Sequence, residues 1–221
     1  MTAHKHRVGL VLGAGAARGW SHIGILKALA AEGIRPDIVC GCSIGALVAA
    51  SSVTGHLESL EARARDMTVS RVVRYFDLSL RGGGIIEGRW ITDFFRESVE
   101  DIDIASSTPV FGAVATDLAS GRETWLTSGS MIDAVRASIA IPGLLAPVFI
   151  RGRWHVDGAL VNPLPVSLCR ALGADVIIGV SLNGNLIARP SPIAVMPPTP
   201  AAPADVELEA ETASSWPRWF G

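Results

Sequence analysis

Long apolar runs are absent from this sequence of 221 residues. No stretch approaches the roughly 20 consecutive apolar residues that a membrane-spanning helix needs. The apolar run 8–12 is also too short for the hydrophobic part of a signal peptide, and it leads into a glycine-rich turn. The sequence therefore predicts a cytoplasmic protein whose contact with a membrane would be peripheral, at the inner membrane face.

Net charge and cysteine are scarce as well. The chain has 19 Lys and Arg against 21 Asp and Glu, and its basic residues are scattered. This distribution argues against nucleic acid as a partner, because a nucleic-acid surface needs clustered positive charge. The three cysteines, Cys40, Cys42 and Cys169, lack the spacing of a metal site. We expect them to be free buried thiols, and we expect neither a bound metal nor an organic cofactor.

What the sequence does contain is an alternation of strand and helix patterns. Hydrophobic residues make up 49% and charged residues 18% of the chain, which is typical of an α/β domain with a substantial core. We expect strands at 8–12, 37–41, 110–116, 122–126 and 176–182, with short strands near Val148 and His155. The strand 176–182 is expected to be buried. We expect helices at 20–31, 44–52, 57–68, 89–99, 130–138 and 165–172, with a glycine break at 82–84 and Ser130 as an N-cap.

These elements predict a three-layer α/β/α sandwich around a mostly parallel sheet, because strands that alternate with helices pair in parallel beneath them. We assign this domain to residues 1–185. From residue 186 onward, prolines stand among alanines and acidic residues, a composition typical of a disordered tail at 186–221.

The motif G-x-S-x-G occurs once, from Gly41 through Ser43 to Gly45, between an expected strand and an expected helix. In that context the glycines relieve crowding at a sharp turn, and the turn exposes the serine hydroxyl beside free helix N–H groups. We therefore predict that Ser43 is the nucleophile of an acyl-ester hydrolase.

A second glycine-rich turn follows the first expected strand, at 13–19. Consecutive backbone N–H groups in such a turn bind a phosphate, a pyrophosphate or an oxyanion. As a dinucleotide fingerprint the turn is imperfect, since its third glycine falls one position late. Beside the Ser43 turn, an oxyanion hole is the simpler interpretation, and a dinucleotide-binding oxidoreductase is a distant alternative.

The general base has two candidates in the sequence. His155 and Asp157 stand two positions apart on an expected strand end, so their side chains share a face. One assignment is a dyad of Ser43 with Asp157. The other is a triad of Ser43, Asp117 and His155, in the chain order of α/β-hydrolases. Asp117 also suits the first position of a turn, and His22 is interpreted as a packed helix residue.

Four blocks of this sequence together resemble the bacterial patatin-like phospholipases of the branch related to neuropathy target esterase. They are Gly13-x-Gly15-x-x-Arg18-Gly19 with the following 20–24, Gly41-x-Ser43-x-Gly45, 115–118 with Gly121, and Asp157-Gly158-Ala159. The segment 136–143 also resembles the stretch that the family places before its Asp-Gly-Ala. The resemblance spans roughly residues 7 to 185.

The resemblance implies a Ser–Asp dyad without histidine, with Ser43 as nucleophile and Asp157 as base. It further implies an oxyanion hole formed by the amides of Gly13, Ala14 and Gly15, with Arg18 fixing the loop. Gly41, Gly45 and Gly158 would be supporting residues of the motifs. The implied substrate is a phospholipid or a lysophospholipid.

The chain departs from the family at two places. Many relatives have glycine where this chain has Ala14 and Ala16, and a Cβ is strained wherever the turn requires a positive φ. Relatives also continue with further helices and strands where this chain has its proline-rich tail, which would be a truncation of the family domain. These departures leave a non-catalytic binding or regulatory protein as the alternative function.

Overall fold

The computed structural model describes residues 6–66 and 95–184. The glycine break at 82–84, most of the helix expected at 89–99 and the tail at 186–221 lie outside the described residues. Of that helix, 95–98 is helical. The domain boundary at 185 also stays a prediction.

Seven strands form one mixed sheet in the order β5-β6-β3-β2-β1-β7, with β4 also paired to β3. The strands are β1 (Val8–Leu12), β2 (Ile38–Cys42), β3 (Val110–Asp117), β4 (Glu123–Leu126), β5 (Val148–Ile150), β6 (Arg153–Asp157) and β7 (Val176–Val180). Strands β7, β1, β2 and β3 are parallel, whereas β4 and β6 run antiparallel to β3. The fold class is thereby confirmed, with a parallel centre and an antiparallel side.

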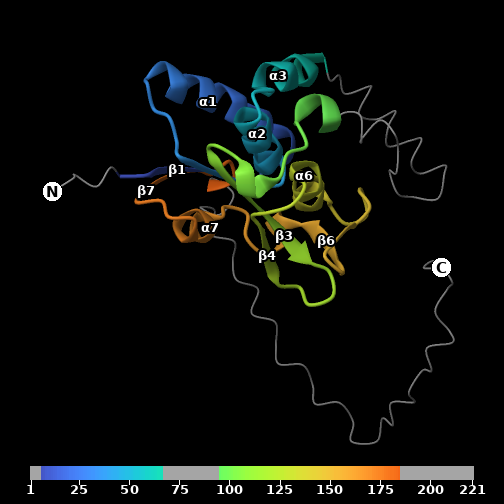
Figure 1. Ribbon diagram of the computed structural model, residues 1–221. Helices are drawn as coiled ribbons and strands as arrows, with labels where there is room; N and C mark the ends of the chain where they lie inside the picture. The colour runs from blue at the N-terminus through green and yellow to red at the C-terminus, as the bar shows by residue number, and fades with distance from the viewer. Residues whose placement is uncertain (1–5, 67–94, 185–221) are drawn as a thin grey trace, which may run out of the picture. The chain divides into compact units, whose positions relative to one another are not determined.

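Helices cover both faces of the sheet (Figure 1). They are α1 (Ser21–Ala31), α2 (Ile44–Val53), α3 (Leu57–Asp66), α6 (Met131–Ile139) and α7 (Val166–Ala171), with 3-10 helices η1 (Ala16–Trp20), η2 (Ile104–Ser106) and η3 (Gly158–Leu160). Helices α1, α2, α3 and α6 share the larger hydrophobic core, and α7 packs in a second, smaller core on the other face. Within the described ranges, no helix is both long and apolar enough to cross a bilayer.

Local signals in the sequence set the ends of several helices. Helix α1 stops before Gly33, whose φ of 74° is the left-handed conformation that ends helices and that glycine adopts without strain. Helix α6 begins after Ser130, whose side chain accepts a hydrogen bond from the Asp133 amide at 3.0 Å. The predicted N-cap is confirmed.

The register of β3 brings two strand ends together. Parallel strand β2 pairs along the first part of β3, up to Cys42 opposite Val114. Antiparallel strand β6 pairs along the last part, beginning with Asp157 opposite Ala115. Because β4 overlaps both of them in register, β4 occupies one edge of β3, and β2 and β6 share the other. The carboxyl ends of β2 and β6 therefore meet at neighbouring positions along one strand.

The expectation of a buried strand at 176–182 is wrong. Strand β7 ends at Val180, pairs with β1 at the edge of the sheet and is partly exposed along its length, with Val176 52% exposed. An apolar run indicated burial, but its position at the edge of the sheet leaves one side of the strand without a described neighbour.

Candidate active site

Ser43 occupies the turn between β2 and α2 with a φ of 55° and a ψ of −127°. A non-glycine residue rarely adopts this backbone conformation, and such strain is concentrated at functional sites. The side chain is almost buried, at 6% exposure. The sharp turn places the hydroxyl at the carboxyl end of β2 and at the N-terminus of α2, where helix N–H groups are unpaired.

Neither Gly41 nor Gly45 has a positive φ. The need for glycine at these two positions therefore comes from close packing. A Cβ on Gly41 would lie 2.4 Å from the Ala46 Cα, and a Cβ on Gly45 would lie 2.1 Å from the Leu12 carbonyl oxygen. The two glycines therefore let α2 press against both the turn and the end of β1.

Asp157 is the last residue of β6, and its carboxylate contacts Ser43 directly. Ser43 Oγ donates to Asp157 Oδ2 at 2.7 Å, and the Ala159 amide donates to Oδ1 at 2.7 Å. Burial raises the pKa of the Asp157 carboxyl above its ordinary value, although both hydrogen bonds act in the opposite direction. A Cβ on Gly158 would lie 2.2 Å from the Val114 carbonyl oxygen, so the turn after Asp157 also depends on glycine.

Ser138, on α6, is a site residue that sequence reasoning did not single out. Its Oγ accepts from the Ser43 amide at 2.9 Å and donates to the Val114 carbonyl at 2.7 Å. The side chain thus ties the strained Ser43 backbone to β3 at the point where β2 stops and β6 begins. The only signal in the sequence was the resemblance of the segment 136–143 to the family.

The glycine-rich turn departs from the expected set of oxyanion donors. The Gly13 amide donates to the Val180 carbonyl at 3.0 Å, and the Ala14 amide donates to the Pro163 carbonyl at 2.8 Å. Amides that already pair with backbone carbonyls are not free to bind an oxyanion, which argues against Gly13 and Ala14 as donors. Among the described residues, none accepts from the amides of Gly15 and Ala16.

Ala16 has a φ of 46°, in the left-handed region where a Cβ is strained. The strain expected from an alanine in this turn is therefore real at Ala16. Ala14 is not among the residues with positive φ. Of the two alanines that stand where many relatives have glycine, only Ala16 has a strained backbone.

Three side chains hold the glycine-rich turn in place. Arg18 Nη2 donates to Asn183 Oδ1 at 2.7 Å, and Asn183 Nδ2 donates to the Ala14 carbonyl at 3.3 Å. Buried His22 bonds through Nε2 to the Gly13 carbonyl at 2.8 Å. Burial lowers the pKa of His22, so the neutral ring acts as the donor. Arg18 therefore acts on the turn through Asn183. His22 is a buried residue of α1 and holds the turn directly.

Asp117 and His155 do not form a triad with Ser43. Asp117 Oδ2 accepts from Arg153 at 2.8 Å, and Oδ1 accepts from the amides of Ala119 and Ser120. The Arg153 guanidinium holds the pKa of the Asp117 carboxyl well below its usual range. Neither ring nitrogen of His155 has a partner among the described residues. Asp117 therefore caps a turn, as its alternative interpretation predicted.

Comparison with known proteins gives consistent matches. A family model described as "Patatin-like phospholipase" matches residues 10–170. An uncharacterized NTE family protein of Mycobacterium tuberculosis is 38% identical over 81% of this chain and 50% of its own length. The lysophospholipase nte1 of Emericella nidulans is 32% identical over 80% of this chain and 12% of its own length.

Among solved structures, VipD from Legionella pneumophila is distantly similar, with a TM-score of 0.37 and 15% identity over 69% of this chain and 46% of VipD. The chain spans about half the length of the mycobacterial relatives that it matches.

Proposed function

The chain belongs to the patatin-like phospholipase family, and from this premise we propose that it hydrolyses carboxylic esters of phospholipids or lysophospholipids through an acyl-serine intermediate. The observation that carries the proposal is the 2.7 Å hydrogen bond from Ser43 Oγ to Asp157 Oδ2. This bond joins a strained serine at a helix N-terminus to a buried carboxylate, which is the arrangement of a nucleophile and its base.

In the first step, Ser43 Oγ attacks the ester carbonyl carbon while its proton passes to Asp157. A free aspartate is a weak base, with a pKa of about 4. Burial raises the pKa of Asp157 and so makes its carboxylate a stronger base. The proton then passes from Asp157 to the leaving alcohol, and the acyl group remains on Ser43.

In the second step, water attacks the acyl-serine and Asp157 takes a proton from that water. The acyl group leaves as a fatty acid, and Ser43 regains its proton. The same carboxylate thus serves as base and acid in turn, and the dyad returns to its starting state.

The negative charge that develops on the carbonyl oxygen needs donors that are already in position. We assign this role to the amides of Gly15 and Ala16, which no described residue uses, with the N-terminus of α2 contributing its dipole. Arg18 and His22 act as positioning residues, because they hold the turn that presents these amides.

A phospholipid substrate implies contact with a lipid surface. Phe149 and Trp154 form an exposed aromatic pair on β5 and β6, with ring centroids 5.0 Å apart. Aromatic side chains favour the interface between water and lipid. We propose peripheral membrane contact through this pair. The location in the cytoplasm, at the inner membrane face, stays a prediction that cell fractionation tests.

The test is the release of p-nitrophenol from a medium-chain ester by the wild type and by Ser43→Ala, Asp157→Asn and Ser52→Ala. We expect the first two variants to lose turnover by several orders of magnitude. Ser52→Ala alters a serine of α2 outside the dyad and serves as the control that keeps turnover. Active variants are then compared on phosphatidylcholine and lysophosphatidylcholine.

Two outcomes contradict the proposal. If folded wild type neither turns over the ester nor reacts with a fluorophosphonate probe, the chain is the non-catalytic binding protein. If Asp157→Asn retains turnover while His155→Gln abolishes it, the base is His155 and the dyad is wrong.

A further inference from the structure

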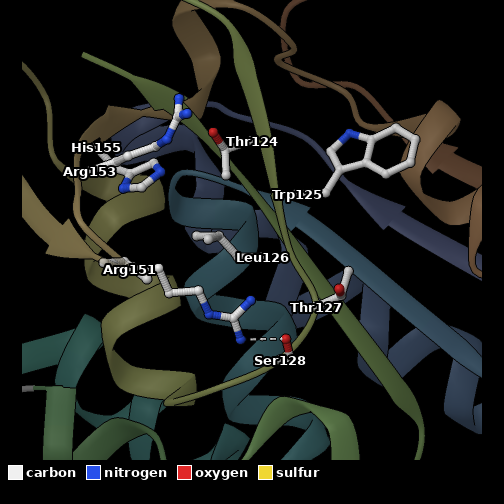
Figure 2. Close-up of a pocket in the computed structure, with 9 residues that line it drawn as sticks. Thr124, Trp125, Leu126, Thr127, Ser128, Arg151, Arg153 and His155 are labelled. Atoms are coloured by element: carbon white, nitrogen blue, oxygen red, sulfur yellow. Dashed lines mark hydrogen bonds between the residues drawn. The ribbon is translucent and has the colours of Figure 1, made fainter. Parts of the chain in front are cut away.

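A small cavity lies on the antiparallel side of the sheet, between β4 and the β5–β6 hairpin (Figure 2). Its volume is about 200 Å³, below the roughly 300–1,000 Å³ typical of drug-sized ligands. Its polar lining includes Thr124, Ser128, Arg151, Arg153 and His155. Such a lining suits a compact group that accepts hydrogen bonds.

His155 is the residue of the cavity that the fold itself does not explain. It is 2% exposed, and neither Nδ1 nor Nε2 has a hydrogen-bond partner among the described residues. Leaving a buried polar group unpaired is unfavourable, so such a group needs an explanation. Figure 2 shows the His155 ring beside the Arg153 side chain, whereas the Trp125 ring points away.

Two arginines line the cavity, and they differ in their partners. Arg153 Nη1 donates to Asp117 Oδ2, and this ion pair carries no net charge. Arg151 Nη2 donates to the neutral Ser128 Oγ at 2.7 Å. Hydrogen bonds from the Ala105 and Gly129 amides, and the charge of Arg151, lower the pKa of the Asp103 carboxyl, which balances part of the Arg151 charge. The guanidinium of Arg151 thus keeps N–H donors for a ligand.

The cavity and the dyad lie on the same face of the sheet. His155 and Asp157 belong to β6 and stand two positions apart, so their side chains point to one face. Two residues of a strand span roughly 7 Å. In a glycerophospholipid the phosphate is joined to the ester carbonyl through the short glycerol unit, and this separation is of the same order.

We propose that the cavity formed by Arg151, Arg153 and His155 is a phosphate-binding subsite. Arg151 supplies N–H donors and a positive charge, Arg153 supplies the N–H groups that Asp117 leaves free, and His155 donates a ring N–H. The phosphate is either that of the lipid substrate, an assignment that rests on the proposed function, or free phosphate. Both sources present the same acceptor oxygens.

Arg151 offers a variant that separates binding from folding. It has a φ of 50° and precedes Gly152, with a φ of 80°, in the two-residue turn between β5 and β6. Asn-Gly is the preferred sequence of such turns. The substitution Arg151→Asn therefore removes the charge and suits the backbone. Likewise, His155→Leu removes unpaired polar atoms from a buried position, a change that a folded core tolerates.

The first measurement is thermal unfolding with inorganic phosphate and with glycerophosphocholine, at constant ionic strength. We expect both ligands to raise the Tm of the wild type, because a ligand that binds only the folded state stabilises it. The rise should disappear in Arg151→Asn and in His155→Leu. It should persist in Arg122→Asn, a control that removes one exposed charge from the neighbouring β3–β4 turn without altering the cavity.

The second measurement identifies the source of the phosphate. For each protein, kcat/KM is compared between lysophosphatidylcholine and the monoacylglycerol with the same chain. If the head group occupies the subsite, the ratio falls about tenfold in Arg151→Asn, the equivalent of one charge-assisted hydrogen bond. An unchanged ratio, with the Tm effect intact, assigns the subsite to free phosphate.

The proposal is overturned if neither ligand raises the Tm of the wild type, or if the rise is equal in all four proteins. These results do not depend on turnover. An inactive protein that still binds phosphate through Arg151 would therefore contradict the proposed hydrolase and leave the subsite standing.

Discussion

Two non-glycine residues of the site, Ala16 and Ser43, have positive φ angles of 46° and 55°. An L-residue in the left-handed region loses roughly 1–2 kcal/mol because its Cβ approaches the backbone. The fold retains this strain at both turns that face the reacting groups. At Ser43 the proposed role of the side chain as nucleophile gives the strain a function. At Ala16 only the backbone amide has a proposed role, and the Cβ adds none.

Replacing Ala16 with glycine is therefore expected to stabilise the protein by about 1 kcal/mol and to keep or raise esterase activity. Ala14→Gly is the matched control, because Ala14 lacks a positive φ. There the added freedom of the unfolded chain should lower stability by roughly 0.5–1 kcal/mol. Urea unfolding and p-nitrophenyl ester turnover measure both effects. Equal stability changes in the two variants would contradict this account.

The raised pKa of Asp157 predicts a pH dependence of activity. The base must be ionised, so kcat/KM should fall as the pH decreases through the folded-state pKa, and the acid limb should lie above the value of about 4 of a free aspartate. A pH–rate profile measures this limb. An acid limb at or below pH 4 would show that the Ser43 and Ala159 hydrogen bonds outweigh burial.

The same shift predicts a pH dependence of stability. Burial raises the pKa of Asp157 in the folded protein above its value in the unfolded chain. The contribution of Asp157 to the free energy of unfolding is therefore fully present below the unfolded-state pKa and is lost as the pH rises through the folded-state pKa. Asp157→Asn should therefore gain stability relative to the wild type on going from acid to neutral pH. Denaturant unfolding at several pH values measures the difference, and a difference that is constant with pH would contradict the prediction.

Ser138 and Ser107 provide a matched pair of buried bridging serines. Ser138 links the Ser43 amide to the Val114 carbonyl, and Ser107 links the Phe111 amide to the Ile104 carbonyl, away from the site. Each change to alanine removes the partner of a buried backbone amide, and we expect each to destabilise by about 1–3 kcal/mol. Only Ser138→Ala should also lower kcat. A similar loss of kcat in folded Ser107→Ala would show a general effect of destabilisation.

At the scale of elements, the approach of α2 to the end of β1 positions Ser43. Gly45 lies where any side chain would collide with the Leu12 carbonyl, whereas a Cβ on Gly24, in α1, would meet nothing within 4 Å. Gly45→Ala should therefore displace α2, with a loss of stability of about 1–3 kcal/mol and of most activity.

Gly24→Ala is the control for helix propensity, and it should stabilise the protein by up to about 1 kcal/mol with activity unchanged. Thermal unfolding and ester turnover distinguish the two substitutions. If Gly45→Ala were as well tolerated as Gly24→Ala, contact between α2 and β1 would not position Ser43.

Strand β3 is the element that brings Ser43 and Asp157 together. It is eight residues long, whereas β2 and β6 have five each. Its length lets β2 end and β6 begin along the same edge, at Val114 and Ala115. Each of these elements was expected from its apolar pattern. Their shared edge was not, because pairing partners leave no mark on the periodicity of a strand.

At the scale of the whole molecule, exposed apolar residues occur at both ends of the sheet. Trp154 on β6 is 53% exposed and Val176 on β7 is 52% exposed. We expect Trp154→Ser to weaken binding to phosphatidylcholine vesicles several-fold, because aromatic rings favour the lipid interface. Val176→Ser, at the other end of the sheet, should have little effect in a vesicle sedimentation assay. Equal effects would show that the lipid surface has no preference for the aromatic pair.

The sequence by itself determined the fold class, most element positions and the family. Apolar periodicity and turn residues act locally, so β1, α2 and α6 were predicted to within about two residues, the precision that such signals allow. The motif around Ser43 and the Asp157-Gly158-Ala159 block were likewise recognisable as residue patterns, although the contacts that require Gly45 and Gly158 are tertiary. Strand β7 was misjudged, since an apolar run carries no information about position at the edge of a sheet.

Only the tertiary structure decided which groups meet. Residues far apart in sequence, such as Ser43, Ser138 and Asp157, come together through strand register and helix packing, which a single sequence does not encode legibly. The occupied amides of Gly13 and Ala14 depend on partners at Val180 and Pro163, more than a hundred residues away. Whether an amide is free to bind an oxyanion is a property of all its neighbours, and those neighbours exist only once the chain has folded.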